Sequence, residues 1–502
     1  MSSQMVDFLT AQTAAPLVLD GTSLGVTDIV NLADGTARPV ADGAALARVT
    51  DAWDAAVRIA TTRRLYGRST GVGANRNAAV PTEDAAGHGL RLLRSHAGAI
   101  GEELPARQVR AMLAVRANQL LAGGSGLRPG VVTALCAALE SGAHPVVNEF
   151  GSVGTGDLAA LAQVGLALAG EHPWQSDSAP EPQPLDHNDA LAFISSNALT
   201  LGQAALALHE LRGLLEATQV VAALTLLAVD GSHEPYAAPV HAARPHPGST
   251  EVARRMRELI GAEEKPAPSA GRVQDPYGLR CLPQIHGPAH DAADALERVL
   301  TVEVNAAAEN PLITPHDLNA YHHGGFYQAQ LALALDHFRL SLTQVARLST
   351  ARLSTLNEPD YTGLHPFLAD HLPASSGVMI LEYAAGAALS DLRAFSAPAS
   401  LGHAVLSRGV EEQASFASLA ARQTLRACTA YRLVIGCELV AAVRALRQRG
   451  VRPAPGLPTE TALRLAENTL DADESDRPLT QDVRQAAGLL DRFTEIWRGS
   501  GG

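Results

Sequence analysis

The chain has 502 residues, of which 46% are apolar but only 4% aromatic, and 39 basic and 52 acidic residues give it a formal net charge of −13. This acidic balance argues against nucleic acid as the main partner. Lys265 is the only lysine and no GK[ST] motif occurs, so a Walker A phosphate loop is excluded. A pyridoxal phosphate Schiff base would have to use that one residue, in an apparently exposed loop.

Cysteine usage and the N-terminal residues bear on the compartment. The four cysteines are scattered and form no CxxC pair, which is typical of buried thiols in a reducing environment. No lysine or arginine precedes Arg38, so neither a signal peptide nor a transit peptide is expected. The sequence offers no uncharged apolar run of about 18 residues, and we therefore expect a cytoplasmic protein without a membrane span.

Helical periodicity dominates the chain. Apolar residues recur at three- and four-residue spacing in six segments, residues 87–100, 106–122, 130–142, 198–229, 290–309 and 326–356. Three Pro-rich or polar stretches read as loops: residues 172–189, the stretch around Lys265, and residues 452–458. Helices that are long and apolar over much of their surface predict an all-α fold built on a long bundle, completed by other subunits.

Two short motifs favour structural roles over the chemistry they resemble. GTSLG at residues 21–25 matches the GxSxG pattern of a serine hydrolase, but no alternation of strands and helices surrounds it, so a simple turn at Ser23 is favoured. HGPAH places His286 and His290 four residues apart but lacks the glutamate of HExxH. Because Pro288 is expected to disturb helical presentation, a structural or substrate-facing role is favoured over metal binding.

Three glycine-rich or polar loops leave alternatives open. YGRSTGVGANRN places Tyr66 at the head of a loop that alone would be only mobile. VQDPYGLRCLPQIHG offers Arg280, which could hold a substrate carboxylate or merely staple a loop. GSVGTGDLAAL, residues 151–161, could form a helix entry with Asp157 at the N-cap, or its backbone could take part in chemistry.

Taken together, these segments resemble the histidine and aromatic amino acid ammonia-lyase family. The matches fall in the family's order between about residues 15 and 430 and comprise LYGRSTGVG, LRLLRSHAGAIGE, VRANQLLAGGSGLRP, AHPVVNEFGSVGTGDLAALA, ALTLLAVDGSHEPYAAPVHAARPHPGS, VQDPYGLRCLPQIHG, NAAAENPL, GGFYQAQLALALD, SSGVMI and PASLGHAVLSRGVEEQASF. The resemblance implies a fumarase/aspartase-like all-α homotetramer whose active sites are built from several subunits. It also implies elimination of ammonia from an L-amino acid, either histidine or arylalanine-like, to give an α,β-unsaturated acid.

The family makes its own electrophile, 4-methylidene-imidazol-5-one, from an internal Ala-Ser-Gly. In this chain the segment is one residue shorter, and only Gly154-Thr155-Gly156 combines a hydroxyl in the middle with an unhindered third nitrogen. The expectation is therefore an imidazol-5-one that carries an ethylidene group, or, as a competing outcome, no ring. Neither a metal nor pyridoxal phosphate is expected.

By position in the family pattern, roles are implied for further residues. Tyr66 would be the base, in a loop containing Gly71; Arg280 would hold the carboxylate, helped by Tyr277 and Gln274. Phe326 would line the site and Glu411 would contact the amine or the side chain. Ser95-His96 falls where the family sets side-chain preference and is more like the histidine-specific branch.

The departures from the pattern gather near the amine. The expected asparagine is Ser195, with Asn197 two residues later, and the GGNFHG pattern loses its asparagine to Gly325 and its histidine to Tyr327. The glutamine before Glu411 is Val410. Such a site could instead lack the prosthetic group and catalyse another elimination or addition, or a 2,3-aminomutase reaction; a non-catalytic paralogue is the alternative outside enzymes. The predicted domains are residues 1–200, 201–430 and 431–502.

Overall fold

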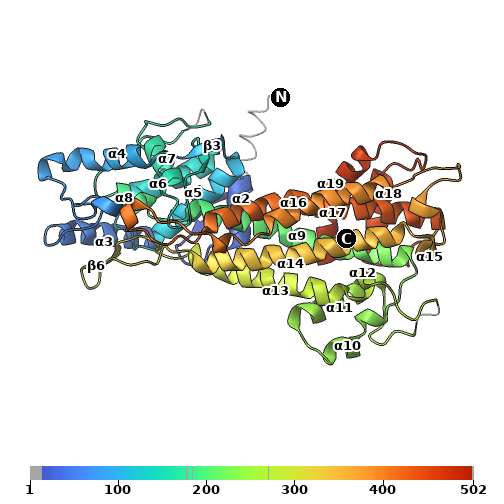
Figure 1. Cartoon of the computed structure of the whole chain (residues 1–502). Coiled ribbons are helices and arrows are strands. Elements are labelled where there is room, and N and C mark those ends of the chain that lie inside the picture. Colours follow the sequence, from blue (N-terminus) through green and yellow to red (C-terminus); the bar gives the residue numbers. More distant parts are fainter. Residues whose placement is uncertain (1–13, 177–178, 184, 269–270, 500–502) are drawn as a thin grey trace. The chain divides into compact units, whose positions relative to one another are not determined.

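A computed structural model describes residues 14–176, 179–183, 185–268 and 271–499 of the chain. Helices predominate in these residues and the strands are short (Figure 1). This confirms the predicted all-α class. The strands form three two-stranded sheets: parallel β1 (Ala15–Leu19) with β2 (Ala37–Ala41), antiparallel β3 (Ile100–Glu103) with β4 (Asn148–Phe150), and antiparallel β5 (Leu312–Thr314) with β6 (Asn319–Tyr321).

The α-helices range from a single turn to more than eight turns. In chain order they are α2 (Val26–Asp34), α3 (Gly43–Ala60), α4 (Ala85–His96), α5 (Ala106–Leu121), α6 (Pro129–Ser141), α7 (Leu158–Leu168), α8 (Ala190–Ile194), α9 (Ala198–Ala228), α10 (Ala238–Ala242), α11 (Pro247–Ile260), α12 (Tyr277–Arg280), α13 (Leu282–Glu303), α14 (Ala329–Leu356), α15 (Pro359–Thr362), α16 (Ile380–Phe395), α17 (Ala417–Arg449), α18 (Pro458–Thr469) and α19 (Thr480–Arg498). Six short 3₁₀ helices join them, η1 (Gly73–Asn75), η2 (Thr82–Asp84), η3 (Glu234–Tyr236), η4 (Pro366–Leu368), η5 (Ala399–Leu401) and η6 (Ser407–Gly409).

The predicted helical segments correspond to observed helices, with one clear difference. The segment predicted at residues 290–309 is α13, which begins at Leu282 and contains Pro288. The expectation that Pro288 disturbs the helix is therefore wrong. The helix packs closely at this point, since a Cβ on Gly287 would lie 2.4 Å from the backbone nitrogen of Ser249. The close approach of Ser249 therefore requires a residue without a side chain at position 287.

Two compact units make up the described chain. The first comprises the described residues up to His209, Leu296–Leu335 and Pro398–Arg422, and the second comprises Glu210–Ala295, Asp336–Ala397 and the described residues from Gln423. The predicted division at residues 200 and 430 stays a prediction.

Helix α5 lies at the core of the first unit. It is buried along most of its length although it carries polar and charged residues. Arg110 donates hydrogen bonds to the carbonyl oxygens of Leu32 and Ala33, at the carboxyl end of α2. A cation satisfies helix-end carbonyls well, because they carry the negative end of the helix dipole. Burial of this charge therefore fixes α2 against α5.

A buried carboxylate ties three helices together in the second unit. Glu438 on α17 accepts hydrogen bonds from Arg352 and Ser349 on α14, and from Thr225 on α9. Both members of the Arg352–Glu438 pair are inaccessible to solvent. Such a pair is tolerated inside a protein only when its hydrogen bonds are complete, and this one accepts four donors.

The segment Ala190–Ala228, which contains α8 and α9, is long and apolar enough by length and composition alone to cross a membrane. Its most apolar stretch is entirely buried inside the described structure. Complete burial of this kind is typical of a core helix.

Candidate active site

A cavity of about 1010 Å³ lies in the first unit, and all of its lining residues belong to that unit. It brings together seven of the predicted site residues, from segments far apart in the chain: Tyr66, His96, Thr155, Gly156, Ser195, Phe326 and Glu411. A concave site with convergent polar and titratable groups is the usual form of an active site.

Tyr66 stands at one side of this cavity, on the loop before η1. Its phenolic oxygen accepts a 2.7 Å hydrogen bond from the backbone N–H of Gly73, and His322 packs edge-on against its ring. Burial raises the pKa of Tyr66, and the charge of Glu411 adds to this. The Gly73 N–H and the charge of Arg76 act in the opposite direction, because both favour the phenolate. The loop thus presents a tyrosine whose ionised form has a fixed donor.

The predicted Gly71 shows why this loop needs glycine. A Cβ on Gly71 would lie 2.7 Å from the carbonyl oxygen of Asn75, closer than side-chain atoms approach a backbone oxygen. The turn that returns Gly73 to the Tyr66 oxygen is therefore possible only with a residue that lacks a side chain at position 71. A hydrogen bond from the backbone N–H of Ala74 to Ser407 Oγ fixes the loop to η6.

Thr155 and Gly156 also line the cavity, and the segment 151–157 that contains them is held by contacts to distant segments. Gly154 has a φ of 89° and Gly156 a φ of 125°, both in the region that favours glycine. Ser415 Oγ donates to the carbonyl oxygen of Gly154 at 2.6 Å, and the Phe416 N–H donates to the carbonyl oxygen of Val153 at 2.8 Å. The glycines therefore serve a backbone that is tied down closely.

Asn197 connects the segment 151–157 to the segment around Phe326. Its Oδ1 accepts from the N–H of Gly156 at 3.1 Å, and its Nδ2 donates to the carbonyl oxygen of Phe326 at 2.8 Å. Asn197 is fully buried and does not line the cavity. Ser195 does line it, and its Oγ accepts from the backbone N–H of Asn310.

Asp157 plays a different part from the helix cap that the sequence suggested. It occupies the N-cap position of α7, but its side chain makes no cap hydrogen bond to that helix. Its carboxylate instead accepts from the backbone N–H and the hydroxyl of Thr200, in the first turn of α9. Burial raises the pKa of this carboxyl, opposed by the hydrogen bonds of Thr200. Asp157 thereby fixes the glycine-rich segment to α9.

His96 ends helix α4 and faces the cavity, whereas its neighbour Ser95 does not line it. The Nδ1 atom of His96 lies 2.9 Å from the carbonyl oxygen of Leu92 and 3.0 Å from Ser95 Oγ. Because a carbonyl oxygen only accepts, Nδ1 carries the proton in this arrangement. With the proton on Nδ1, the Nε2 atom of a neutral ring is a hydrogen-bond acceptor.

The predicted carboxylate-binding residues belong to the second unit. Gln274 and Tyr277 are exposed, and the Arg280 guanidinium lies 4.4 Å from the centre of the Tyr277 ring. Tyr277 and Arg280 occupy the two ends of the single-turn helix α12. None of the three lines the cavity of the first unit. Their role in binding a carboxylate stays a prediction.

A buried ion pair lies beside residues that line the cavity. Arg116 on α5 pairs with Glu309 at 2.8 Å and donates to the carbonyl oxygens of Ala192 and Phe193. Glu309 directly precedes Asn310, which lines the cavity. The pair thus joins α5, α8 and the segment before β5, and its loss would leave an uncompensated buried charge.

Several residues at this site have no role predicted from the sequence, and three of them make informative contacts. Asn310 and His322 line the cavity, and Ser415 contacts the glycine-rich segment. Asn310 and Ser415 lie within the family-like stretches NAAAENPL and EEQASF, which were the available signal. Nothing in the pattern around His322 indicated that it would face Tyr66, because this contact joins residues 256 positions apart.

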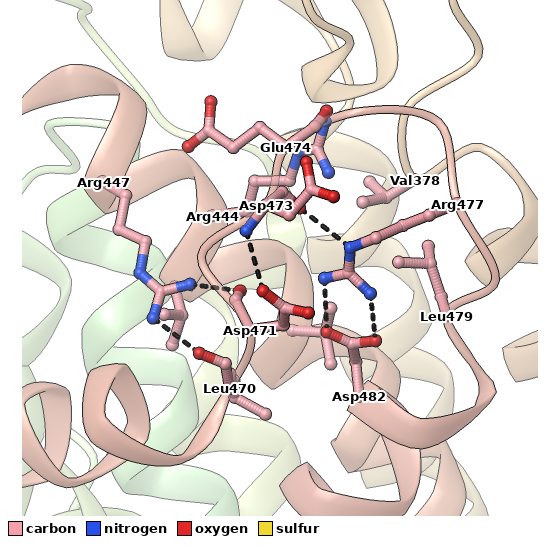
Figure 2. A pocket seen from close by; sticks show the side chains of 12 residues that line it. Val378, Arg444, Arg447, Leu470, Asp471, Asp473, Glu474, Arg477, Leu479 and Asp482 are labelled. Carbon is pink, nitrogen blue, oxygen red and sulfur yellow. Dashed lines mark hydrogen bonds and ion pairs between the residues drawn. The ribbon is translucent and has the colours of Figure 1, made fainter.

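The other conspicuous cluster of charges is structural (Figure 2). In the second unit Arg477 pairs with Asp482, while Arg444 and Arg447 donate to backbone carbonyl oxygens of the segment between α18 and α19. The space between these side chains is only about 20 Å³. This is about the room of one water molecule, so the cluster ties the chain together and offers no ligand site.

The remaining sequence motifs also have structural surroundings. Ser23 Oγ donates to Asp20 in a turn after β1, as a simple turn requires. His286 is buried and His290 half-buried in α13, and His290 hydrogen-bonds Gln219 and stacks on Trp497. Burial lowers the pKa of His290 to about 4. Among the described residues no group of three or more His, Cys, Asp or Glu could hold a metal ion.

The sequence of this chain is similar to those of aromatic amino acid lyases. The family profile described as aromatic amino acid lyase matches residues 24–468. Histidine ammonia-lyase of Geobacillus kaustophilus is 35% identical over 448 residues, which cover 86% of this chain and 88% of that protein.

Two crystal structures share the fold over nearly the whole chain. Histidine ammonia-lyase from Trypanosoma cruzi has a TM-score of 0.88 and 27% identity, covering 97% of this chain and 95% of that one. Tyrosine aminomutase from Streptomyces globisporus has a TM-score of 0.89 and 25% identity, covering 96% and 98%.

Proposed function

Because the chain belongs to the aromatic amino acid lyase family, we propose that its cavity is the active site of an ammonia-lyase that acts on L-histidine. The reaction would release ammonia and an α,β-unsaturated acid, as a carbon–nitrogen lyase does. The relatives named histidine ammonia-lyase support an ammonia-lyase activity on an amino acid.

The acceptor atom of His96 is the observation that carries the choice of substrate. With Nδ1–H directed to Leu92 and Ser95, Nε2 can accept a hydrogen bond inside the cavity. An imidazole N–H of histidine can donate to it, whereas a phenyl ring leaves it unpaired. A site built to hydrogen-bond a substrate donor rejects the analogue that lacks the donor, because a desolvated polar atom then has no partner.

Tyr66 is the proposed base for the β-proton. Its oxygen accepts a hydrogen bond from the Gly73 N–H, which stabilises the phenolate that takes the β-proton and becomes the neutral phenol. The electron pair of the broken C–H bond forms the new double bond, and the amine leaves with the pair of the C–N bond. Glu411, which also lines the cavity, is proposed to contact the amine or the side chain.

The segment Gly154-Thr155-Gly156 fits a self-made imidazol-5-one on two observations. Thr155 and Gly156 line the cavity, and both backbone groups that would form the ring already have polar partners, Asn197 on Gly156 N–H and Ser415 on Gly154 O. Such a ring would supply an electrophilic alkene for the substrate amine. The chain's own contribution is the anchoring of this segment by Asn197 and Ser415.

The proposal includes a cytoplasmic homotetramer in which Gln274, Tyr277 and Arg280 bind the substrate carboxylate. The exposed Tyr277 and the guanidinium over its ring offer a phenol and a planar cation that match a carboxylate. Carboxylate binding by these residues is testable, since Arg280→Met should raise KM for the amino acid far more than it lowers kcat. The four cysteines, all free, are compatible with a reducing compartment.

A 2,3-aminomutase reaction is the second candidate, supported by the likeness to tyrosine aminomutase. Incubation of the purified protein with L-histidine, L-phenylalanine and L-tyrosine separates the candidates. Preferred release of ammonia from L-histidine supports the proposal, a β-amino acid product supports the mutase, and preference for L-phenylalanine contradicts the role given to His96.

A further inference from the structure

Ser415 lies on the carbonyl group that ring closure would consume. Its Oγ–H donates to the carbonyl oxygen of Gly154 at 2.6 Å, the short end of the range for hydroxyl donors. Ser415 is only 5% exposed, so bulk water does not compete for this oxygen. A hydrogen bond in such a place strengthens as negative charge develops on the oxygen.

The nucleophile of the same reaction is held from the other side. The backbone N–H of Gly156 donates to Asn197 Oδ1 at 3.1 Å, and Asn197 is itself fixed through its bond to the Phe326 carbonyl. The two atoms that must join, Gly156 N and Gly154 C, therefore belong to groups that each have a defined polar partner. Positioning of this kind removes much of the entropic barrier to an intramolecular reaction.

The glycine at position 154 makes room for this donor. A Cβ there would lie 2.2 Å from Ser415 Oγ and 2.8 Å from the backbone nitrogens of Phe416 and Ala417. Alanine, the residue of the family pattern at this position, is incompatible with the observed approach of Ser415. The chain therefore combines a glycine with a hydroxyl at the reacting carbonyl.

We propose that Ser415 is a catalytic residue of self-processing, donating its proton to the Gly154 carbonyl oxygen as Gly156 N attacks the carbonyl carbon. The N–C bond forms, the C=O π pair moves to oxygen and takes the Ser415 proton, and the proton released from Gly156 N restores Ser415. The oxygen then leaves as water with the Thr155 N–H proton, forming a C=N bond.

Loss of a second water completes the processing. This water is formed from the Cα hydrogen and the hydroxyl group of Thr155, and an ethylidene group is left on the ring. The sum is the loss of two waters with no net oxidation or reduction, so no co-reactant is required. This inference rests on the ring that the proposed function includes, and it assigns the step to a side chain.

Ser418 provides a matched control. Its Oγ donates to the carbonyl oxygen of Ser152 at 2.9 Å, from the same end of α17 to the same loop. That carbonyl takes no part in ring closure. Loss of the Ser418 hydroxyl therefore removes a similar anchor without touching the reacting atoms.

The test is peptide mass spectrometry across residues 140–165 at intervals after cell-free synthesis. Wild type and Ser418→Ala should lose two waters at similar rates. Ser415→Ala should be slower by about 10²–10³-fold, the usual effect of removing one donor from a developing oxyanion. Ser415 Oγ also accepts a hydrogen bond from the Ala417 N–H, so its removal also takes away a contact at the start of α17. Circular dichroism therefore checks that each variant is folded.

Ser415→Cys guards against a folding defect, since a thiol has nearly the same shape but is a weak donor. Slower processing in a folded Cys or Ala variant, with Ser418→Ala normal, supports the proposal. Processing at the wild-type rate in either position-415 variant overturns it, as does an unmodified wild-type segment. Ammonia release is measured in parallel. A wild-type protein that releases ammonia from histidine without losing two waters would contradict the role of Ser415 but leave the proposed ammonia-lyase activity in place.

Discussion

The backbone N–H of Gly73 donates a 2.7 Å hydrogen bond to the phenolic oxygen of Tyr66. The bond closes the loop on itself and places a donor at the atom that would carry the charge of a phenolate. Burial nevertheless raises the pKa of Tyr66 above its ordinary value of about 10. Below that pKa the phenolate is the minor form, and its fraction grows with pH.

The first prediction follows from this increase of the phenolate fraction with pH. kcat/KM for L-histidine should rise by up to about tenfold per pH unit through the alkaline range, because the proton acceptor is the deprotonated tyrosine. Tyr66→Phe should lower kcat by about 10²–10⁴-fold and abolish the rise. A variant with near wild-type kcat would show that another group takes the proton.

Arg76 and Arg64 provide a variant and its control for the pH profile of kcat/KM. Both residues line the cavity, but only the charge of Arg76 lowers the pKa of Tyr66. Arg76→Met should shift the alkaline limb to higher pH, and Arg64→Met should leave it in place. Equal shifts in both variants would mean that the charge of the cavity as a whole sets the profile.

The second prediction concerns selectivity at His96. His96→Phe removes the acceptor, and the ratio of kcat/KM for L-histidine over L-phenylalanine should fall by about 10–100-fold, the value of one hydrogen bond of roughly 1–3 kcal/mol. Ser95→Ala is the control, because the Leu92 carbonyl still holds the Nδ1 proton. An unchanged ratio in His96→Phe would remove the argument for histidine.

The third prediction reverses a departure from the family pattern. Gly154→Ala restores the alanine but places a Cβ 2.2 Å from Ser415 Oγ at a φ of 89°. Strain of this kind costs about 1–3 kcal/mol, and the urea unfolding midpoint should fall accordingly. Gly98→Ala, where a Cβ meets no atom within 4 Å, is the control and should unfold as wild type does. Equal stability of the two variants would contradict the described packing of Ser415.

The fourth prediction tests the buried ion pair beside the cavity. Arg116→Met leaves Glu309 buried without its partner and should destabilise the protein by about 3–5 kcal/mol. Arg94→Met, which breaks the exposed pair with Glu171, should change the unfolding midpoint little. If the double variant Arg116→Met with Glu309→Leu proves no more stable than Arg116→Met, the buried charge is not the cause.

Helical periodicity and ordered motifs were sufficient to predict the fold and several residues that line the cavity. Tyr66, Thr155, Phe326 and Glu411 come from segments far apart in the chain, and the family pattern indicated that they would meet. The start of α13 was not predicted: the helix begins at Leu282 and runs through Pro288, which was expected to disturb it.

The hydrogen bonds of the glycine-rich segment could not be predicted from spacing. The donor on Gly154 comes from a residue 261 positions away, and the acceptor on Gly156 N–H is Asn197 and not Ser195 at the family position. Asp157 was predicted to cap α7 because the sequence indicates only which residues are its neighbours along the chain. Its true partner, Thr200, lies on another helix.

The most direct test is the product balance of the wild-type protein with L-histidine, with ammonia and the unsaturated acid quantified in the same reaction. We predict equal amounts of the two, formed faster than the corresponding products from L-phenylalanine. A folded protein that releases no ammonia, or converts L-histidine to a β-amino acid without net ammonia, would contradict the ammonia-lyase assignment.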